Sequence, residues 1–211
     1  MTSEILKQLQ WRYACKKFDE THKISEEKIT LLKEVFNLTA TSYGLQPLKM
    51  IMITNPKIKE DLVPMTMNQL QVKDCSHVLV LCTETKMDAY FIENYFKNVQ
   101  AVRSTPSEIL DPFKNFLIED FAGKTQDAID TWMAKQAYIA LGNLLTVCAL
   151  EKIDGCPIEG FDPEEYDRYL NLKEKGLQSV LVLAVGKRAE DDMFANLAKV
   201  RRGVEEVVID M

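Results

Sequence analysis

The chain has 211 residues, 46% of them hydrophobic and 27% charged, which is ordinary for a globular protein of one domain or two small ones. Its formal net charge of −6 argues against a general nucleic-acid surface, which needs clustered positive charge. The longest apolar runs fall short of the roughly 20 residues that cross a bilayer. The N-terminal residues lack the basic and apolar regions of a secretory signal. We therefore expect a cytoplasmic protein with no nucleic-acid or membrane partner.

The cysteines do not form a recognisable metal or disulfide pattern. There are five, at positions 15, 75, 82, 148 and 156, with no CxxC pair and only two histidines. A structural zinc site normally needs four Cys or His ligands in close pairs. Free thiols in a reducing compartment are the simplest interpretation, and we expect no metal.

Apolar periodicity and capping signals predict a chain with many helices and few strands. The predicted helices cover residues 3–13, 25–36, 56–63, 88–102, 106–121 and 125–150, with a short one from 163. Continuous apolar runs predict buried strands at 48–54, 77–82 and 179–185, and residues 205–210 are a candidate edge strand. Neither repeats nor low-complexity linkers interrupt the chain. The pattern predicts a single mixed α/β or α+β domain over residues 1–211.

The predicted helix at 125–150 is unusually apolar on most of its sides. Ala134, Ala137, Ala140 and Gly142 are small enough to let another backbone approach closely. A helix of this kind must be buried, either in the centre of the domain or in a subunit interface.

Several common catalytic motifs are absent or only apparent. GxGxxG does not occur, so a standard Rossmann site is not supported. Gly123-Lys124-Thr125 resembles the end of a phosphate-binding loop, but Ile118 stands where its first glycine would be, which favours a helix end. Adjacent lysines favour a thiolate at Cys15, but without a histidine partner an incidental free thiol is the better interpretation.

Four separated segments carry the chemistry that remains. They are the basic run at 12–19, the hydroxyl-rich turn at 41–47, Pro157-Ile158-Glu159-Gly160-Phe161, and Lys199-Val200-Arg201-Arg202. Taken alone, each has an ordinary structural explanation, because basic residues often end helices and Pro-x-x-Gly often forms a turn.

In this order and spacing, the segments resemble the nitroreductase family of FMN-dependent NAD(P)H oxidoreductases, and most closely its oxygen-insensitive NAD(P)H nitroreductase and dihydropteridine reductase branch. Further matches lie at 74–77, 132–136, 142–143 and 172–176, so the resemblance spans the chain. It implies an α+β fold with a central, mostly antiparallel sheet surrounded by helices. It also implies an intertwined homodimer with two FMN sites, each built from both subunits. Residues 88–121 would form a helical excursion over the substrate cleft.

The resemblance also implies which residues bind the flavin. Arg12, Lys199 and Arg201 would hold the phosphate, because a nearly dianionic group needs clustered cations. Lys16 would lie at the pyrimidine edge, and a backbone N–H near Glu159 would face N5. The full predicted set of cofactor-binding residues is Arg12, Tyr13, Ala14, Lys16, Thr41, Ser42, Gly44, Gln46, Asn68, Gln71, Gln136, Pro157, Ile158, Glu159, Gly160, Lys199 and Arg201.

The chain departs from the family pattern at four of these or neighbouring positions. Ala14 lacks the hydroxyl of the usual serine, and Gly44 stands where asparagine is common. Leu48 replaces a frequent tryptophan, and Gln71 replaces a lysine. These departures affect flavin affinity and potential more directly than they affect the fold.

The implied reaction transfers a hydride from NADH or NADPH through flavin N5 to an electron-poor acceptor by a ping-pong mechanism. Nitroaromatics, quinones and dihydropteridine-like or enone compounds are the candidate acceptors. Positioning and flavin electronics supply the catalysis, so no side-chain acid or base is required. Three alternatives remain open: a relative that dehalogenates or cleaves flavin, a flavin carrier or sensor, and a dimeric scaffold without cofactor.

Phe113, Phe116 and Phe121 either form an aromatic lid or, as we favour, pack within the helical pair.

Overall fold

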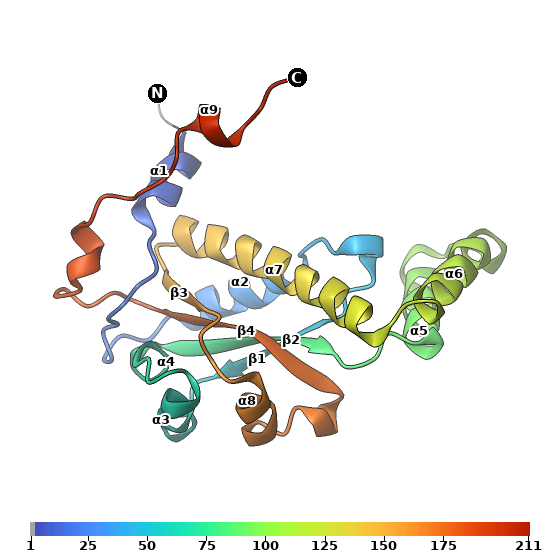
Figure 1. The fold of residues 1–211 in the computed structure, drawn as a ribbon, viewed down its shortest axis with the longest axis horizontal. Coiled ribbons are helices and arrows are strands. Elements are labelled where there is room, and N and C mark those ends of the chain that lie inside the picture. Colours follow the sequence, from blue (N-terminus) through green and yellow to red (C-terminus); the bar gives the residue numbers. More distant parts are fainter. Residues whose placement is uncertain (1–2) are drawn as a thin grey trace.

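The computed structural model describes residues 3–211 and is built on a four-stranded, fully antiparallel sheet. The strands are β1 (Leu48–Ile53), β2 (His77–Glu84), β3 (Asp154–Ile158) and β4 (Leu177–Gly186), in the order β1-β2-β4-β3 (Figure 1). The two central strands, β2 and β4, are the longest apolar runs and are buried on both faces. The sheet confirms the predicted α+β fold.

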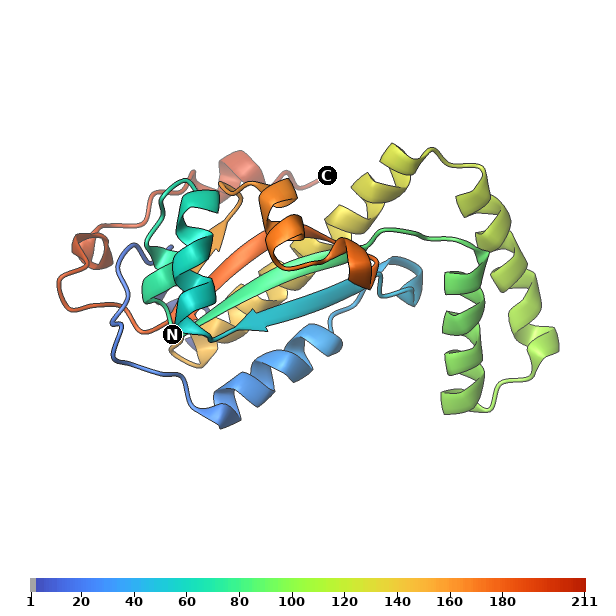
Figure 2. The same ribbon diagram turned by 90° about the horizontal axis from the view of Figure 1, so that it is seen from below.

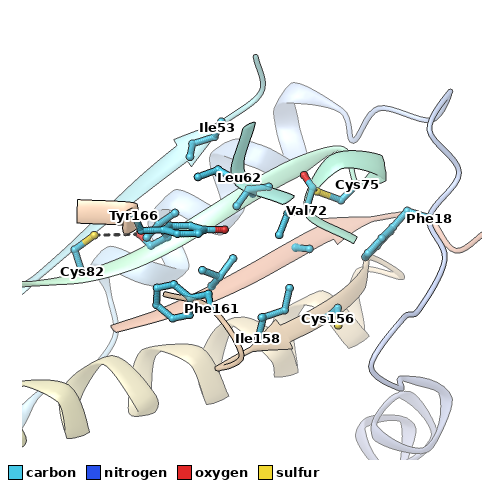
Figure 3. Packing of buried hydrophobic residues seen from close by; sticks show 14 of the residues in the cluster. Phe18, Ile53, Leu62, Val72, Cys75, Cys82, Cys156, Ile158, Phe161 and Tyr166 are labelled. Carbon is cyan, nitrogen blue, oxygen red and sulfur yellow. Dashed lines mark hydrogen bonds between the residues drawn. The ribbon is translucent and has the colours of Figure 1, made fainter. Parts of the chain in front are cut away.

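Helices cover both faces of this sheet (Figures 1 and 2). One face packs against α2 (Glu26–Asn37) and α7 (Gln126–Leu150), and the other against α3 (Pro56–Met65), α4 (Gln71–Asp74) and α8 (Pro163–Tyr169). Alternate residues of β2 separate accordingly. Leu79 and Leu81 belong to the core under α7, whereas Val78 and Val80 belong to the core around Tyr166, part of which is shown in Figure 3.

A helical hairpin projects from one end of the molecule, and the first helix lies toward the other end. The hairpin consists of α5 (Ala89–Arg103) and α6 (Ser107–Ala122) and projects beyond the sheet (Figure 2). At the other end, α1 (Glu4–Trp11) lies near the C-terminal segment that contains the short helix α9 (Val204–Val207) (Figure 1). Single 3₁₀ turns occur at Ser42–Gly44, Lys173–Lys175 and Met193–Asn196.

Local sequence signals place most helix ends correctly. The Ser25 hydroxyl accepts a hydrogen bond from the Lys28 N–H at 3.4 Å, as expected of an N-cap. Gly123 ends α6, and the Thr125 side chain caps α7. The tripeptide Gly123-Lys124-Thr125 is therefore a helix boundary, as favoured from the sequence, rather than a phosphate-binding loop.

Two strand predictions need correction, and one strand was not predicted. Residues 205–210 do not form an edge strand. These residues are exposed and pair with no strand of the described sheet. They form the end of α9 and then irregular chain. The unpredicted strand is edge strand β3 at Asp154–Ile158, where a proline that donates no hydrogen bond is tolerated. The strand at Leu48–Ile53 lies at the other edge, and only Ile53 in it is buried.

The long helix α7 is part of the core. Among the helices within residues 3–211, it alone is long and apolar enough to cross a bilayer. Buried helices of folded proteins often have the same length and composition. Nine of its side chains are buried, including the polar Gln136. Its opposite side remains partly uncovered, since Tyr138 and Ile139 are about half exposed.

Candidate functional site

The two ends of the chain enclose a pocket of about 510 Å³ rich in positive charge. One wall is the turn that follows α1, the other is the segment from 194 to 201, and Pro157 of β3 contributes between them. Seven of the predicted cofactor-binding residues line it: Arg12, Tyr13, Ala14, Lys16, Pro157, Lys199 and Arg201. Residues almost 190 positions apart in the sequence are thus brought together.

Backbone contacts hold the first wall against the sheet. Ala14 forms a parallel bridge with Gly155, and the Cys15 N–H donates to the Gly155 carbonyl at 3.2 Å. This pairing continues the sheet beyond β3 and places Lys16 near Pro157. The Cys15 thiol is fully buried, and burial raises its pKa to about 12, which is opposite to the shift of an activated nucleophile.

A buried carboxylate joins the second wall to the first. Asp192, 3% exposed, accepts hydrogen bonds from the Tyr13 hydroxyl at 2.8 Å and from the backbone N–H groups of Lys16 and Lys17 at 2.9 and 3.1 Å. Burial alone would raise the pKa of Asp192, but these hydrogen bonds outweigh it and lower the pKa. The carboxylate therefore stays ionised at neutral pH.

The cations of the pocket are not neutralised by acidic side chains. Within residues 3–211, none of Arg12, Lys16, Lys199 and Arg201 forms an ion pair. Lys199 instead donates to the Arg12 carbonyl. Partial burial and then the positive charges of Arg12 and Arg201 lower the pKa of Lys199. An anion in this pocket would relieve that repulsion, so the pocket is suited to a phosphate or a similar group.

A second group of predicted residues lies beside the end of β3. The Gln69 side chain donates to the Gly160 carbonyl at 2.9 Å, and a Cβ on Gly160 would lie 3.2 Å from the Met67 sulfur. This contact brings the turn that contains Asn68 next to the Pro157–Gly160 segment. The Glu159 carboxylate accepts a hydrogen bond from the Tyr138 hydroxyl of α7. Gln71 is the first residue of α4, which follows this turn, and Ile158 is buried in the hydrophobic core.

The remaining predicted residues lie in a different part of the chain. Thr41 accepts a hydrogen bond from the Gln46 N–H at 3.1 Å, and the buried Gln136 amide accepts one from the Ser42 N–H at 2.8 Å. These bonds shape the turn before β1. None of Thr41, Ser42, Gly44, Gln46 and Gln136 lines the cationic pocket. One chain alone therefore does not unite the whole predicted set, whose role in cofactor binding stays a prediction.

The structure gives a local reason for one departure from the family pattern. Gly44 has a φ of +72°, in the region that glycine and asparagine tolerate best. A Cβ at this position would lie 2.5 Å from the Tyr95 hydroxyl of α5. Glycine here allows the turn to contact the hairpin. Leu48, the first residue of β1, is half-buried under α7 and α2.

The three phenylalanines of α6 have different surroundings. Phe121 is buried, and its ring lies edge-on to Trp132 with centroids 5.0 Å apart. Phe113 and Phe116 are 45% and 54% exposed and stack on each other. Packing within the helices, the favoured interpretation, thus fits Phe121 better than the other two.

Asp192 is the functional candidate that the sequence interpretation missed. It lies seven residues before Lys199 in a polar stretch, between Asp191 and Met193, where nothing marks it as buried. Only the fold shows that its side chain turns inward.

Comparison with known proteins gives the class and then the family. Two relatives match nearly end to end. The oxygen-insensitive NAD(P)H nitroreductase of Salmonella typhimurium is 31% identical over 95% of this chain and 96% of its own. The major NAD(P)H-flavin oxidoreductase of Aliivibrio fischeri is 31% identical over 99% of both. The expected class, an NAD(P)H-dependent oxidoreductase, is thereby confirmed. Residues 9–187 match the Nitroreductase family, and the chain belongs to that family.

Solved structures show the same fold. A nitroreductase-like protein from Streptococcus mutans superposes with a TM-score of 0.87 at 21% identity and covers all of both chains. A nitroreductase-type protein from Exiguobacterium sibiricum, solved in complex with FMN, has a TM-score of 0.84 at 20% identity, covering 100% of this chain and 99% of its own. The predicted nitroreductase-like fold is confirmed.

Anion affinity of the cationic pocket should depend on pH through Lys199. A bound phosphate favours protonated Lys199, so affinity should be full below the lowered pKa of this lysine and fall as the pH rises through it. With FMN as the phosphate-bearing probe, we expect binding to weaken by about tenfold as the pH rises from neutral through the lowered pKa of Lys199, since a hydrogen bond to a charged group contributes roughly 1.5–3 kcal/mol. Fluorescence titration measures this. Lys199→Gln should bind more weakly at neutral pH and lose the slope; an equal slope in wild type and variant would contradict the assignment.

Proposed function

We propose that this protein binds FMN between its own pocket and a second subunit and uses it to transfer hydride from NADH or NADPH to an electron-poor acceptor. The observation that carries the proposal is the group of four cations that form no ion pair within residues 3–211, gathered from both ends of the chain at the end of β3. Family membership supports the flavin chemistry, and a structural neighbour was solved with FMN.

The residues of the pocket fit the parts of this cofactor. Arg12, Lys199 and Arg201 would hold its phosphate, since clustered cations bind a dianion well. Lys16 would lie at the ring's pyrimidine edge and stabilise negative charge there. Bound FMN would supply the redox chemistry, with N5 as the atom that would exchange hydride with NAD(P)H and then with the acceptor in a ping-pong sequence. The backbone after β3, near Glu159, would face the ring, and the Tyr138 contact would steady it.

A homodimer would complete this site. The turn at Thr41–Gln46 and the helical hairpin lie away from the cationic pocket, at the other end of the sheet (Figure 2). The uncovered side of α7, with Tyr138 and Ile139, provides an apolar surface for a second copy. In such a dimer the partner's turn and hairpin would cover the flavin, and residues 88–122 would act as the excursion over the substrate cleft. Phe113 and Phe116 would then contribute an aromatic surface to it.

The acceptors that fit best are flat, electron-poor molecules such as nitroaromatics, quinones, enones and dihydropteridine-like compounds. The cleft would be shared between nucleotide and acceptor, so no separate nucleotide-binding fold is needed. None of the residues named in the site has to act as a general acid or base. We further propose that the protein works in the cytoplasm, where NADH and NADPH are available.

Initial-rate kinetics test this function. With the FMN-loaded protein, we expect either nucleotide to be oxidised only when a nitroaromatic or quinone is present. Double-reciprocal plots at several acceptor concentrations should be parallel, because the nucleotide leaves before the acceptor binds. Intersecting lines would contradict the ping-pong order. Nucleotide oxidation no faster than with free FMN would contradict the enzyme and favour a carrier, a sensor or a scaffold.

Mixed dimers test the shared site. Lys16→Glu should inactivate the pocket half, and Thr41→Asp should inactivate the turn half while keeping an oxygen that accepts from the Gln46 N–H. In a mixed dimer one site carries both changes and the other neither, so about half of the wild-type activity should return.

Co-expression with two different affinity tags isolates the mixed dimer, and each variant homodimer serves as the control. If every site formed within one chain, both sites of the mixed dimer would be defective. Absence of recovered activity would therefore contradict the shared site, as would full activity of the Thr41→Asp homodimer.

A further inference from the structure

Asp192 makes an unusual number of contacts for one carboxylate. Oδ2 accepts from the Tyr13 hydroxyl and from the N–H groups of Lys16 and Lys17, and Oδ1 accepts from the Phe194 N–H at 3.1 Å. Both oxygens are thus used within the chain. The donors come from the turn after α1 and from the start of the C-terminal segment, which form the two walls of the cationic pocket.

Few other hydrogen bonds hold the C-terminal segment in place. Within residues 3–211, the one hydrogen bond that returns from residues 193–211 to the rest of the fold, apart from those to Asp192, is that of Lys199 to the Arg12 carbonyl. All pocket residues from 194 to 201 follow Asp192. The chain before Asp192 is paired with the turn as far as Ala189, whose N–H donates to the Lys17 carbonyl at 2.9 Å, so Asp192 is the last contact that fixes where residues 193–201 begin. Without it, the part of the chain beyond Ala189 would have to be ordered when a ligand binds, and that ordering would cost affinity.

The charge of Asp192 by itself works against an anionic ligand. A carboxylate beside a phosphate site repels the phosphate, so its presence there needs a compensating role. Five donors, with the Cys15 thiol at 3.7 Å as the weakest, share its negative charge, and the lowered pKa keeps it ionised and able to accept all of them. The gain is geometric, because the two walls stay together before a ligand arrives.

We propose that Asp192 is a positioning residue for the phosphate end of the cofactor. By fixing the position of the segment after residue 192 relative to the 13–17 turn, it keeps Arg12, Lys199 and Arg201 in one pocket. This inference rests on the proposed function, since FMN is the phosphate-bearing ligand. It assigns to Asp192 no contact with the cofactor itself.

A second buried aspartate provides a matched control. Asp167, 7% exposed, accepts hydrogen bonds from the Ser179 N–H at 2.8 Å and the Ser179 hydroxyl at 2.7 Å. It links α8 to β4 and does not line the cationic pocket. Asp192→Asn and Asp167→Asn each leave a buried amide where a hydrogen-bonded carboxylate stood, so both should lower the melting temperature.

The test compares FMN with riboflavin, which has the same ring system but no phosphate. Dissociation constants of both flavins, measured by fluorescence with purified full-length protein, give the FMN preference of each variant. We expect this preference to fall about tenfold in Asp192→Asn, corresponding to one charged hydrogen bond to the phosphate, and to be unchanged in Asp167→Asn. A purely structural role would weaken both flavins alike.

An unchanged FMN preference in Asp192→Asn, or an equal loss in Asp167→Asn, would overturn the proposal.

Tyr13→Phe is a milder variant for the same test, since it removes one donor to Asp192 and keeps the ring against the Arg188 guanidinium, 4.6 Å away. It should lower the FMN preference in the same direction by a smaller factor, and no change would count against the proposal even if Asp192→Asn fails to fold. If the wild type itself binds neither flavin, the proposed function fails; if it prefers FMN and only the variants behave otherwise than expected, the failure is confined to Asp192.

Discussion

The site depends on one structural constraint, the joining of the two chain ends at the same end of the sheet. Ala14 and Cys15 extend the edge of β3, and Asp192 ties the returning C-terminal segment to the neighbouring turn. Backbone hydrogen bonds from the Asp19 N–H to the Lys187 carbonyl and from the Ala189 N–H to the Lys17 carbonyl strengthen the same junction. With them, the cations share a pocket of about 510 Å³. The antiparallel sheet and its helices provide the rigid body against which this junction forms.

The local charge of the pocket differs in sign from the net charge of the chain. The chain is acidic overall, and several of its lysines on helices pair with carboxylates, as Lys57 does with Asp61. The cations of the pocket lack such partners within residues 3–211, and the one buried acid among them directs its oxygens to a hydroxyl and to backbone N–H groups. Such an arrangement favours a small anion held at one place over a long polyanion.

Much of the fold was predictable from local signals. Ser25 and Thr125 mark helix starts by capping, and β2 and β4 stand out as apolar runs buried on both faces. The strand β3 was not predicted as such, because Asp154–Ile158 is short, contains Gly and Pro, and is a strand only through pairing with β4. The four candidate binding segments could be recognised by order and spacing. Asp192 could not, since its burial results from packing between segments almost 180 residues apart.

The most direct test of the account is the visible absorption spectrum of the purified protein, reconstituted with FMN if colourless, before and after NADH or NADPH is added under nitrogen. The account predicts flavin bands that disappear when the nucleotide is added, because a bound flavin accepts its hydride. Bound flavin whose bands persist would contradict an NAD(P)H-dependent enzyme, and the absence of bound flavin after reconstitution would contradict the assignment of the cationic pocket itself.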